Sequence, residues 1–206
     1  WSGINVGNNN TFRCIAADPI SPEVLYSAVR ASIESVYRSN DFGSTWSLWD
    51  QGLPSENMRP TALFAALGSS ETVVFLGRPG PSFSYLRLYR RLATGDAWAI
   101  DSRGLENGNI EANQVHSLAY APETQILYGR YGPYARYFKG SIYGNTWTIG
   151  PPVSLFSHGY EGDIETDLEN PQRYFATSAA NYCQFFYSLD ETRTPIEQEE
   201  NYQLPD

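Results

Sequence analysis

Four acidic residues at alternate positions form one chemically distinctive segment of the chain: Glu161, Asp163, Glu165 and Asp167. If this segment is a β-strand, side chains two residues apart lie on one face and the carboxylates are neighbours. Ca²⁺ takes oxygen ligands, so Asp163 and Glu165 are candidate calcium ligands. Two carboxylates in a cleft could instead act as acid and base in glycoside hydrolysis, with Asp163, Glu165 and Asp167 as the candidates. A solvated acidic face without either role is the third interpretation.

A second segment, residues 128–138, places four tyrosines and two arginines around a Gly-Pro turn. Exposed tyrosine rings can stack on sugar faces, and guanidinium groups donate hydrogen bonds to hydroxyls or carboxylates. We expect Tyr131 and Tyr134, nearest the turn, to be exposed, and with them Arg130 and Arg136 are candidate ligand-binding residues. The alternative is a β-hairpin whose tyrosines pack and whose arginines extend along the surface.

The cysteines and histidines add little chemistry. Cys14 and Cys183 are either two buried thiols or a disulfide that closes a loop of about 170 residues. In the chain-entropy model such a disulfide stabilises the folded state by roughly 5 kcal/mol. The two histidines have no cysteine partners, so no zinc signature is present. No phosphate loop, dinucleotide fingerprint or nucleophile elbow occurs. We therefore expect no cofactor, with Ca²⁺ as the exception to test.

Charge and composition exclude some classes of protein. The net charge is −9, and nucleic-acid binding needs clustered basic residues, so we expect no nucleic-acid partner. No apolar run reaches eighteen residues, so we expect no membrane span. Lys139 is the only lysine among fourteen basic residues, and tyrosine and asparagine are abundant. This composition favours a secreted, cell-surface or periplasmic protein.

Eight residues contain the clearest motif of the chain, Ser39-x-Asp41-x-Gly43-x-Thr45-Trp46. An aspartate here can accept hydrogen bonds from nearby backbone N–H groups, and a glycine takes a positive φ that other residues resist. The pattern therefore predicts a tight turn between two strands, followed by a tryptophan that opens the next strand and packs its ring under the hairpin.

Degraded copies of this motif recur along the chain at Trp98, at Gly144 and Trp147, and at Ser188 and Asp190. The closing positions 46, 98, 147 and 195 are separated by 52, 49 and 48 residues. A pair of apolar or aromatic residues at 25–26, 74–75, 127–128 and 174–175 recurs with a similar period. Two markers with one period indicate four repeats of about fifty residues, and repeats of this length are typical of propellers and solenoids.

Each repeat reads as four short strands, which in the first repeat are expected at 13–17, 24–29, 35–39 and 46–49. The motif at 39–46 resembles the Asp-box (BNR) repeat of sialidases, xyloglucan-cleaving glycosidases, sortilin-like receptors and photosystem assembly factors. The resemblance implies an all-β fold, a β-propeller of four roughly 50-residue four-stranded blades. It also implies that the box is structural and lies away from the active face. Arg13 faintly resembles the arginine of the first sialidase strand, but four repeats do not supply the other arginines of that family.

The expected domain is a single one, 1–206, with repeats at 11–53, 59–105, 114–153 and 161–202. Residues 1–6 resemble an outer strand, and they could supply the fourth strand of the last blade and so close a four-bladed ring. Closure would bring Cys14 and Cys183 close together. The alternative is that the chain is part of a larger propeller.

The function favoured by these observations is an extracellular binding module for a carbohydrate or a protein, with loops presented by a rigid propeller. Such a module is not an enzyme, and it is a monomer or a ring-completing oligomer. The first alternative is a fragment or subunit of a propeller glycoside hydrolase that uses paired carboxylates. The second is a structural building block of an assembly.

Overall fold

The computed structural model describes residues 11–30, 35–54, 60–79, 86–101, 105, 115–131, 136–149, 164–166, 174–178, 184–188 and 196–197. These residues form four antiparallel sheets of four strands each, with the strands of every sheet in chain order. The described part of the chain holds no helix long and apolar enough to cross a membrane. The all-β fold class is therefore confirmed.

Each sheet lies within one of the four sequence repeats. The first sheet contains β1 (Thr11–Ala17), β2 (Leu25–Arg30), β3 (Ser35–Ser39) and β4 (Ser47–Leu48). The second contains β5 (Ala62–Leu67), β6 (Thr72–Pro79), β7 (Leu86–Leu92) and β8 (Ala99–Ile100). The third contains β9 (Val115–Ala121), β10 (Ile126–Tyr131), β11 (Arg136–Ser141) and β12 (Thr148–Ile149). The fourth contains β13 (Ile164–Thr166), β14 (Tyr174–Ser178), β15 (Gln184–Ser188) and β16 (Ile196–Glu197).

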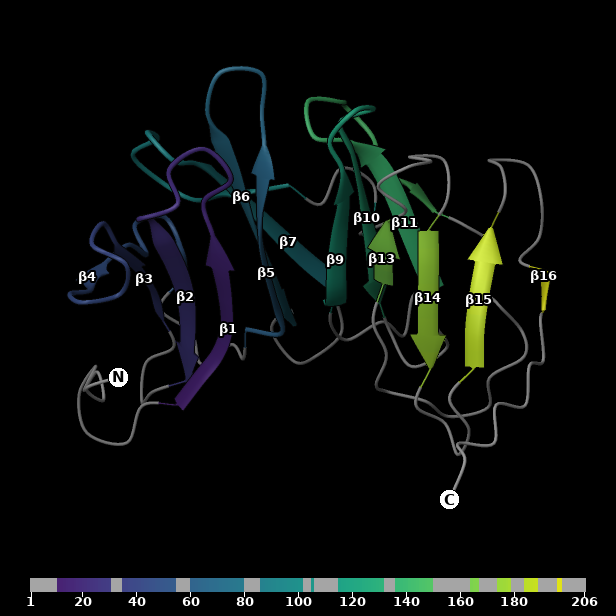
Figure 1. The fold of residues 1–206 in the computed structure, drawn as a ribbon, viewed down its shortest axis with the longest axis horizontal. Helices are drawn as coiled ribbons and strands as arrows, with labels where there is room; N and C mark the ends of the chain where they lie inside the picture. Colours follow the sequence, from purple (N-terminus) through teal and green to yellow (C-terminus); the bar gives the residue numbers. More distant parts are fainter. Residues whose placement is uncertain are drawn as a thin grey trace.

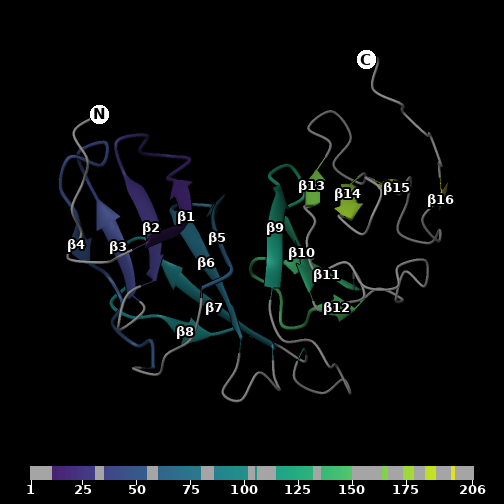
Figure 2. The same ribbon diagram turned by 90° about the horizontal axis from the view of Figure 1, so that it is seen from below.

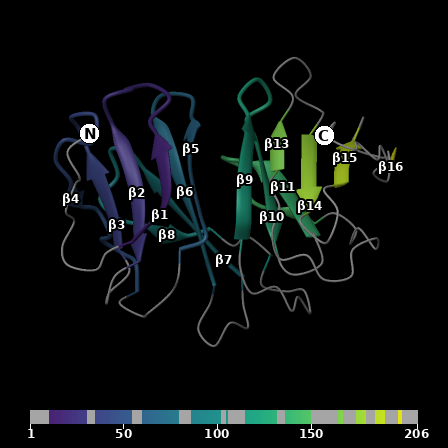
Figure 3. The same ribbon diagram turned by 60° about the horizontal axis from the view of Figure 1, so that its bottom comes forward.

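The first strands of the sheets lie side by side, with β1 against β5, β5 against β9 and β9 against β13. The remaining strands of each sheet extend outward from this row, so the four sheets spread like a fan (Figure 2). The first and fourth sheets lie at the two ends of the fan in all three views (Figures 1, 2 and 3).

The outer strand of each sheet is only two residues long, and it pairs with the third strand in the same register each time. The equivalent pairs are Tyr37 with Leu48, Tyr89 with Ile100, Phe138 with Ile149 and Phe186 with Glu197. Ile196–Glu197 thus fills the place in the fourth sheet that we expected residues 1–6 to fill. Residues 1–6 themselves lie outside the described residues.

Apolar side chains pack between successive sheets in three clusters. Between the first and second sheets, the Trp49 and Trp98 rings meet edge to face with centroids 5.2 Å apart. The Arg91 guanidinium lies 4.1 Å from the centroid of the Trp49 ring, a cation–π contact that is strengthened because both groups are buried. The next cluster joins the second and third sheets, where Phe138 and Trp147 also meet edge to face.

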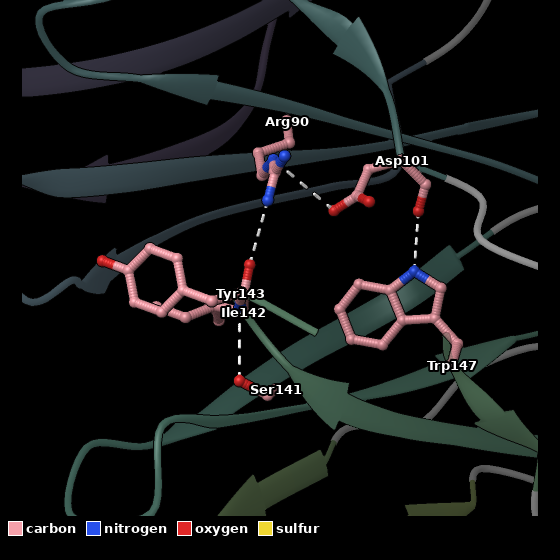
Figure 4. A network of polar contacts seen from close by, with 6 residues as sticks. All are labelled: Arg90, Asp101, Ser141, Ile142, Tyr143 and Trp147. Carbon is pink, nitrogen blue, oxygen red and sulfur yellow. Dashed lines mark hydrogen bonds and ion pairs between the residues drawn. The ribbon is translucent and has the colours of Figure 1, made fainter. Parts of the chain in front are cut away.

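Two kinds of hydrogen bond recur at the boundaries between sheets. Trp98 donates from Nε1 to the Trp49 main-chain oxygen at 2.8 Å, and Trp147 donates to the Asp101 oxygen at 2.7 Å. In the other direction, Arg38 donates to the Ala93 oxygen at 3.2 Å and Arg90 to the Ile142 oxygen at 3.0 Å (Figure 4). The same pair of bonds thus joins the first sheet to the second and the second sheet to the third.

The turn of the first repeat confirms its predicted hydrogen bonding. The Asp41 carboxylate accepts bonds from the Thr45 backbone N–H at 2.8 Å and from the Thr45 hydroxyl at 2.6 Å. Ser39 donates its hydroxyl to Asp41 at 2.7 Å and accepts the Gly43 N–H at 2.8 Å. Gly43 has φ of 84°, the positive value for which glycine is suited. These bonds, first of all those from Thr45, hold the pKa of Asp41 below its usual range.

Cys14, on β1, is a free thiol in this structure, so the predicted disulfide with Cys183 is not confirmed. Burial raises the pKa of the Cys14 thiol, against an opposing effect from the neighbouring Arg13. Cys183 lies outside the described residues, so its pairing stays a prediction.

Candidate functional site

The two ends of the sheets differ in charge. We call the end that carries the β1–β2 turn and the motif turn of each repeat the turn end. The described turns at this end contain no lysine or arginine and six acidic residues: Asp18, Glu23, Asp41, Glu71, Asp96 and Glu123.

The opposite end, where β1 begins and β2 ends, carries arginines; we call it the loop end. Arginines stand within three residues of the strand termini here in three sheets: Arg13, Arg30, Arg78, Arg87, Arg130 and Arg136. Near the turn-end termini the same measure finds four basic residues: Arg38, Arg90, Arg91 and Lys139. Thirteen arginines occur in the whole chain. Nearly half of them therefore gather at one end of a protein whose net charge is −9.

The second sheet places two of these arginines opposite one another. Arg78 on β6 pairs directly with Arg87 on β7. Between them lies Tyr89, whose hydroxyl accepts a 3.4 Å hydrogen bond from Arg87 and whose ring centroid is 5.8 Å from the Arg78 guanidinium. Arg78 is buried and Arg87 is half-buried, so Arg87 is the more accessible member of the pair. Guanidinium groups bind carboxylates with charge-assisted, often bidentate hydrogen bonds.

The third sheet continues the positive character of this end. Arg130 is fully buried near the end of β10, and His116 is half-buried near the start of β9. Burial, with a smaller effect from the Arg130 charge, lowers the pKa of His116 to about 4. His116 is therefore neutral at pH 7, and the positive charge here is that of Arg130.

The tyrosine–arginine segment is arranged differently from our expectation. The prediction that Tyr131 is exposed is wrong, because its exposed fraction is 0% and its ring packs 6.0 Å from the Phe138 ring. Arg130 is equally buried. β10 continues to Tyr131, so strand alternation points this ring at the second sheet. Tyr134 and the Arg136 side chain lie outside the described residues.

The acidic segment is described only at its centre, in β13. Ile164 is fully buried against the third sheet and Glu165 is exposed on the opposite face. Asp163 and Asp167 lie outside the described residues, so the calcium and glycosidase predictions stay untested. Among the residues that the structure places, no group of three or more His, Cys, Asp or Glu side chains could hold a metal ion.

Sequence reasoning missed Arg78, Arg87 and Tyr89 as a group. The alternation of β6 and β7 places them on one face, but a single arginine in a strand is an ordinary residue. The usable signal was positional, because Arg78, Arg87, Arg130 and Arg136 all flank the expected loops between the second and third strands of their repeats.

No protein-family model matches the sequence, and no curated protein does. Solved structures are similar to it. A structure titled YCF48 bound to D1 peptide aligns with 91% of this chain and 54% of its own, with 12% identity and a TM-score of 0.55. An ancestral GH74 enzyme aligns with 91% of this chain and 27% of its own, with 14% identity and a TM-score of 0.60.

The chain thus spans about half the length of the first of these proteins and about a quarter of the second. Identities this low carry the fold and leave function open. The likeness, together with the four repeated sheets arranged around a row of first strands, shows a β-propeller fold.

Proposed function

We propose that this chain is a non-catalytic protein-binding module, built of four propeller blades, which recognises an acidic segment of another protein at its loop end. The observation that carries the proposal is the concentration of arginines there, above all the Arg78–Arg87 pair. Two adjacent guanidinium groups create a positive potential that attracts and orients carboxylates.

The form of the partner follows from the character of the site. Arg87 is half-buried and Arg13 is exposed, so guanidinium groups are accessible at two neighbouring sheets. An extended peptide with side-chain or terminal carboxylates could reach both, whereas a single small anion could reach only one. The structure of YCF48 bound to a peptide supports this choice, since it shows that a propeller with a similar fold can hold a peptide. We place the module outside the cytoplasm on the strength of its composition.

The glycoside hydrolase alternative rests on the acidic segment, and the ancestral GH74 enzyme shares the fold. Of Asp163, Glu165 and Asp167, the structure describes Glu165 alone, and Glu165 is exposed on the face of β13 opposite the buried Ile164. The arginines of the loop end come from three sheets, and we therefore favour protein binding over glycoside hydrolysis.

A peptide library tests the proposal. Acidic peptides with free carboxyl termini should bind in a fluorescence anisotropy assay, and Arg87→Gln should weaken binding about 10-fold, which corresponds to the loss of one charge-assisted contact. Lys139→Gln is the matched control, because it removes one positive charge from the half of β11 nearer the turn end. Equal losses in both variants, or binding to neutral glycans and to no acidic peptide, would contradict the proposal.

A further inference from the structure

One apolar position recurs at the same place in the first strand of every sheet. Its side chain is exposed in the first sheet and buried in the other three. Ile15, Leu63, Leu118 and Ile164 are equivalent, since they pair with Ser27, Leu76, Gly129 and Ala176 in the second strands. Their exposed fractions are 62%, 8%, 8% and 0%. Each of the last three packs against the preceding sheet. Ile15 carries the same kind of side chain, but it faces solvent.

The tryptophans show the same difference. Trp98 and Trp147 are 3% and 5% exposed, and each donates its indole N–H to the preceding sheet. Trp46 is half-buried and donates instead to Gly43 within its own turn, at 3.1 Å. The outer face of the first sheet therefore has the aliphatic residue and the indole that the second and third sheets use to dock.

The fourth sheet carries a complementary face at the other end of the fan. Ile164 and Thr166 point at the third sheet, where the Thr166 hydroxyl donates to the Tyr120 oxygen at 2.9 Å. Glu165 lies between them, so it is exposed on the face that no described sheet covers. On the first sheet, the exposed Arg13 lies two residues before Ile15, at the register shift between Phe12 and Cys14. The first strands of the two end sheets thus carry exposed side chains of opposite charge.

We propose that the outer face of the first sheet, with Arg13, Ile15 and Trp46, is the docking surface for the fourth sheet of a second copy of this chain. The contact would repeat the interface between the first and second sheets, and its charge pairing would join Arg13 to the acidic strand of the partner copy. The first and fourth sheets of one molecule lie at opposite ends of the fan, so the contact forms between molecules (Figure 2). Such a head-to-tail contact closes into a ring where the rotation allows it. This inference shares Arg13 with the proposed peptide site but rests on observations of its own, the exposure of Ile15 and the hydrogen bonding of Trp46.

Sedimentation velocity over a series of concentrations tests this inference. The wild-type chain should associate reversibly, and Ile15→Arg should weaken association about 10-fold or more, because it places a charge in an apolar contact. Ile100→Arg is the matched control. Ile100 is 54% exposed and lies on the outer strand of the second sheet, so its substitution should leave association unchanged.

Charge reversal provides a second test that does not disturb apolar packing. Arg13→Glu and Glu165→Arg should each weaken association, and the double variant should restore it, because the two charges then attract again. A wild-type chain that is monomeric at every concentration would overturn the inference, and so would association that Ile15→Arg leaves intact. A monomer that Ile15→Arg destabilises would show that a blade of the same molecule covers this face, which overturns it as well.

Discussion

The Trp147 indole nitrogen lies 2.7 Å from the main-chain oxygen of Asp101, and the hydrogen bond between them crosses from the third sheet to the second (Figure 4). Near it, Arg90 donates to the Ile142 oxygen and lies 3.8 Å from the Asp101 carboxylate. Contact between sheets is therefore specified by directional bonds as well as by apolar packing. These bonds are the features of the fold that substitution can test most directly.

Trp147→Phe should lower the free energy of unfolding by about 1–3 kcal/mol, the cost of leaving a buried acceptor without its donor. Trp46→Phe is the matched control, because this half-buried indole donates its N–H to Gly43 within its own turn. Its effect should be below about 1 kcal/mol. Urea unfolding monitored by fluorescence and circular dichroism gives both values. Equal effects at the two positions would argue against a special role for the bond between sheets.

Asp18→Asn should destabilise the protein at neutral pH by about 1.5–3 kcal/mol, the range for hydrogen bonds to a charged group. The buried Asp18 carboxylate accepts bonds from Tyr26 at 2.7 Å and from Thr72, in the next sheet, at 2.6 Å. Burial acts to raise the pKa of Asp18, but the hydrogen bonds outweigh it and the net shift is downward.

The sign of the pH dependence follows from this shift. Because the folded-state pKa of Asp18 is lowered, its stabilisation is present above the unfolded value of about 3.9 and is lost as the pH falls through the folded pKa. The wild type should therefore lose stability more steeply in acid than Asp18→Asn. Parallel slopes for the two proteins between neutral and acidic pH would contradict this assignment.

Gly129→Ala should destabilise the third sheet by about 1–3 kcal/mol through overpacking. A Cβ on Gly129 would overlap the Phe138 ring, which is itself buried. At Gly95 the closest atom would be 3.2 Å away, in the partly exposed Leu92, so Gly95→Ala should change stability much less. Thermal unfolding of the two variants compares them, and a larger loss at Gly95 would refute the packing argument.

His116 should titrate with a pKa of about 4 in the folded protein, as measured by NMR. A folded-state value below the unfolded value of about 6.5 means that the unfolded chain binds more protons between these limits. His116 thus makes stability fall as the pH drops from about 6.5 towards 4. Arg130→Gln should raise the pKa of His116, because it removes a nearby positive charge. A titration near 6.5 would show that the ring is solvated.

Much of the fold could be predicted from the sequence because the same pattern of strands and turns recurs in four repeats. The third strand of the first repeat is found at Ser35–Ser39, where it was expected. The outer strand is shorter than the expected 46–49, because Trp46 belongs to the motif turn and Trp49 packs against the second sheet, which leaves two residues for pairing.

The site was harder to predict, because exposure depends on which face of a strand a neighbouring sheet covers. Tyr131 was expected at a turn, but β10 extends to it and alternation sends its ring into the boundary with the second sheet. The Arg78–Arg87 pair depends on a register that no local pattern specifies. Residues 1–6 were predicted to complete the last sheet because the segment after residue 195 has a weak strand pattern. Two residues of that segment are enough, since the outer strand is two residues long in every repeat.

The self-contained turn of the first repeat has a consequence for how such a chain can change by duplication. Ser39, Asp41 and Thr45 satisfy one another within seven residues and require nothing from a neighbouring sheet. The turns ending at Trp98 and Trp147 lack this aspartate, and their tryptophans are held by carbonyl groups of the sheet before them. A newly duplicated repeat can thus form its turn with its own side chains. Its turn residues can be substituted later, once a carbonyl group of an adjacent repeat accepts the hydrogen bond of its tryptophan.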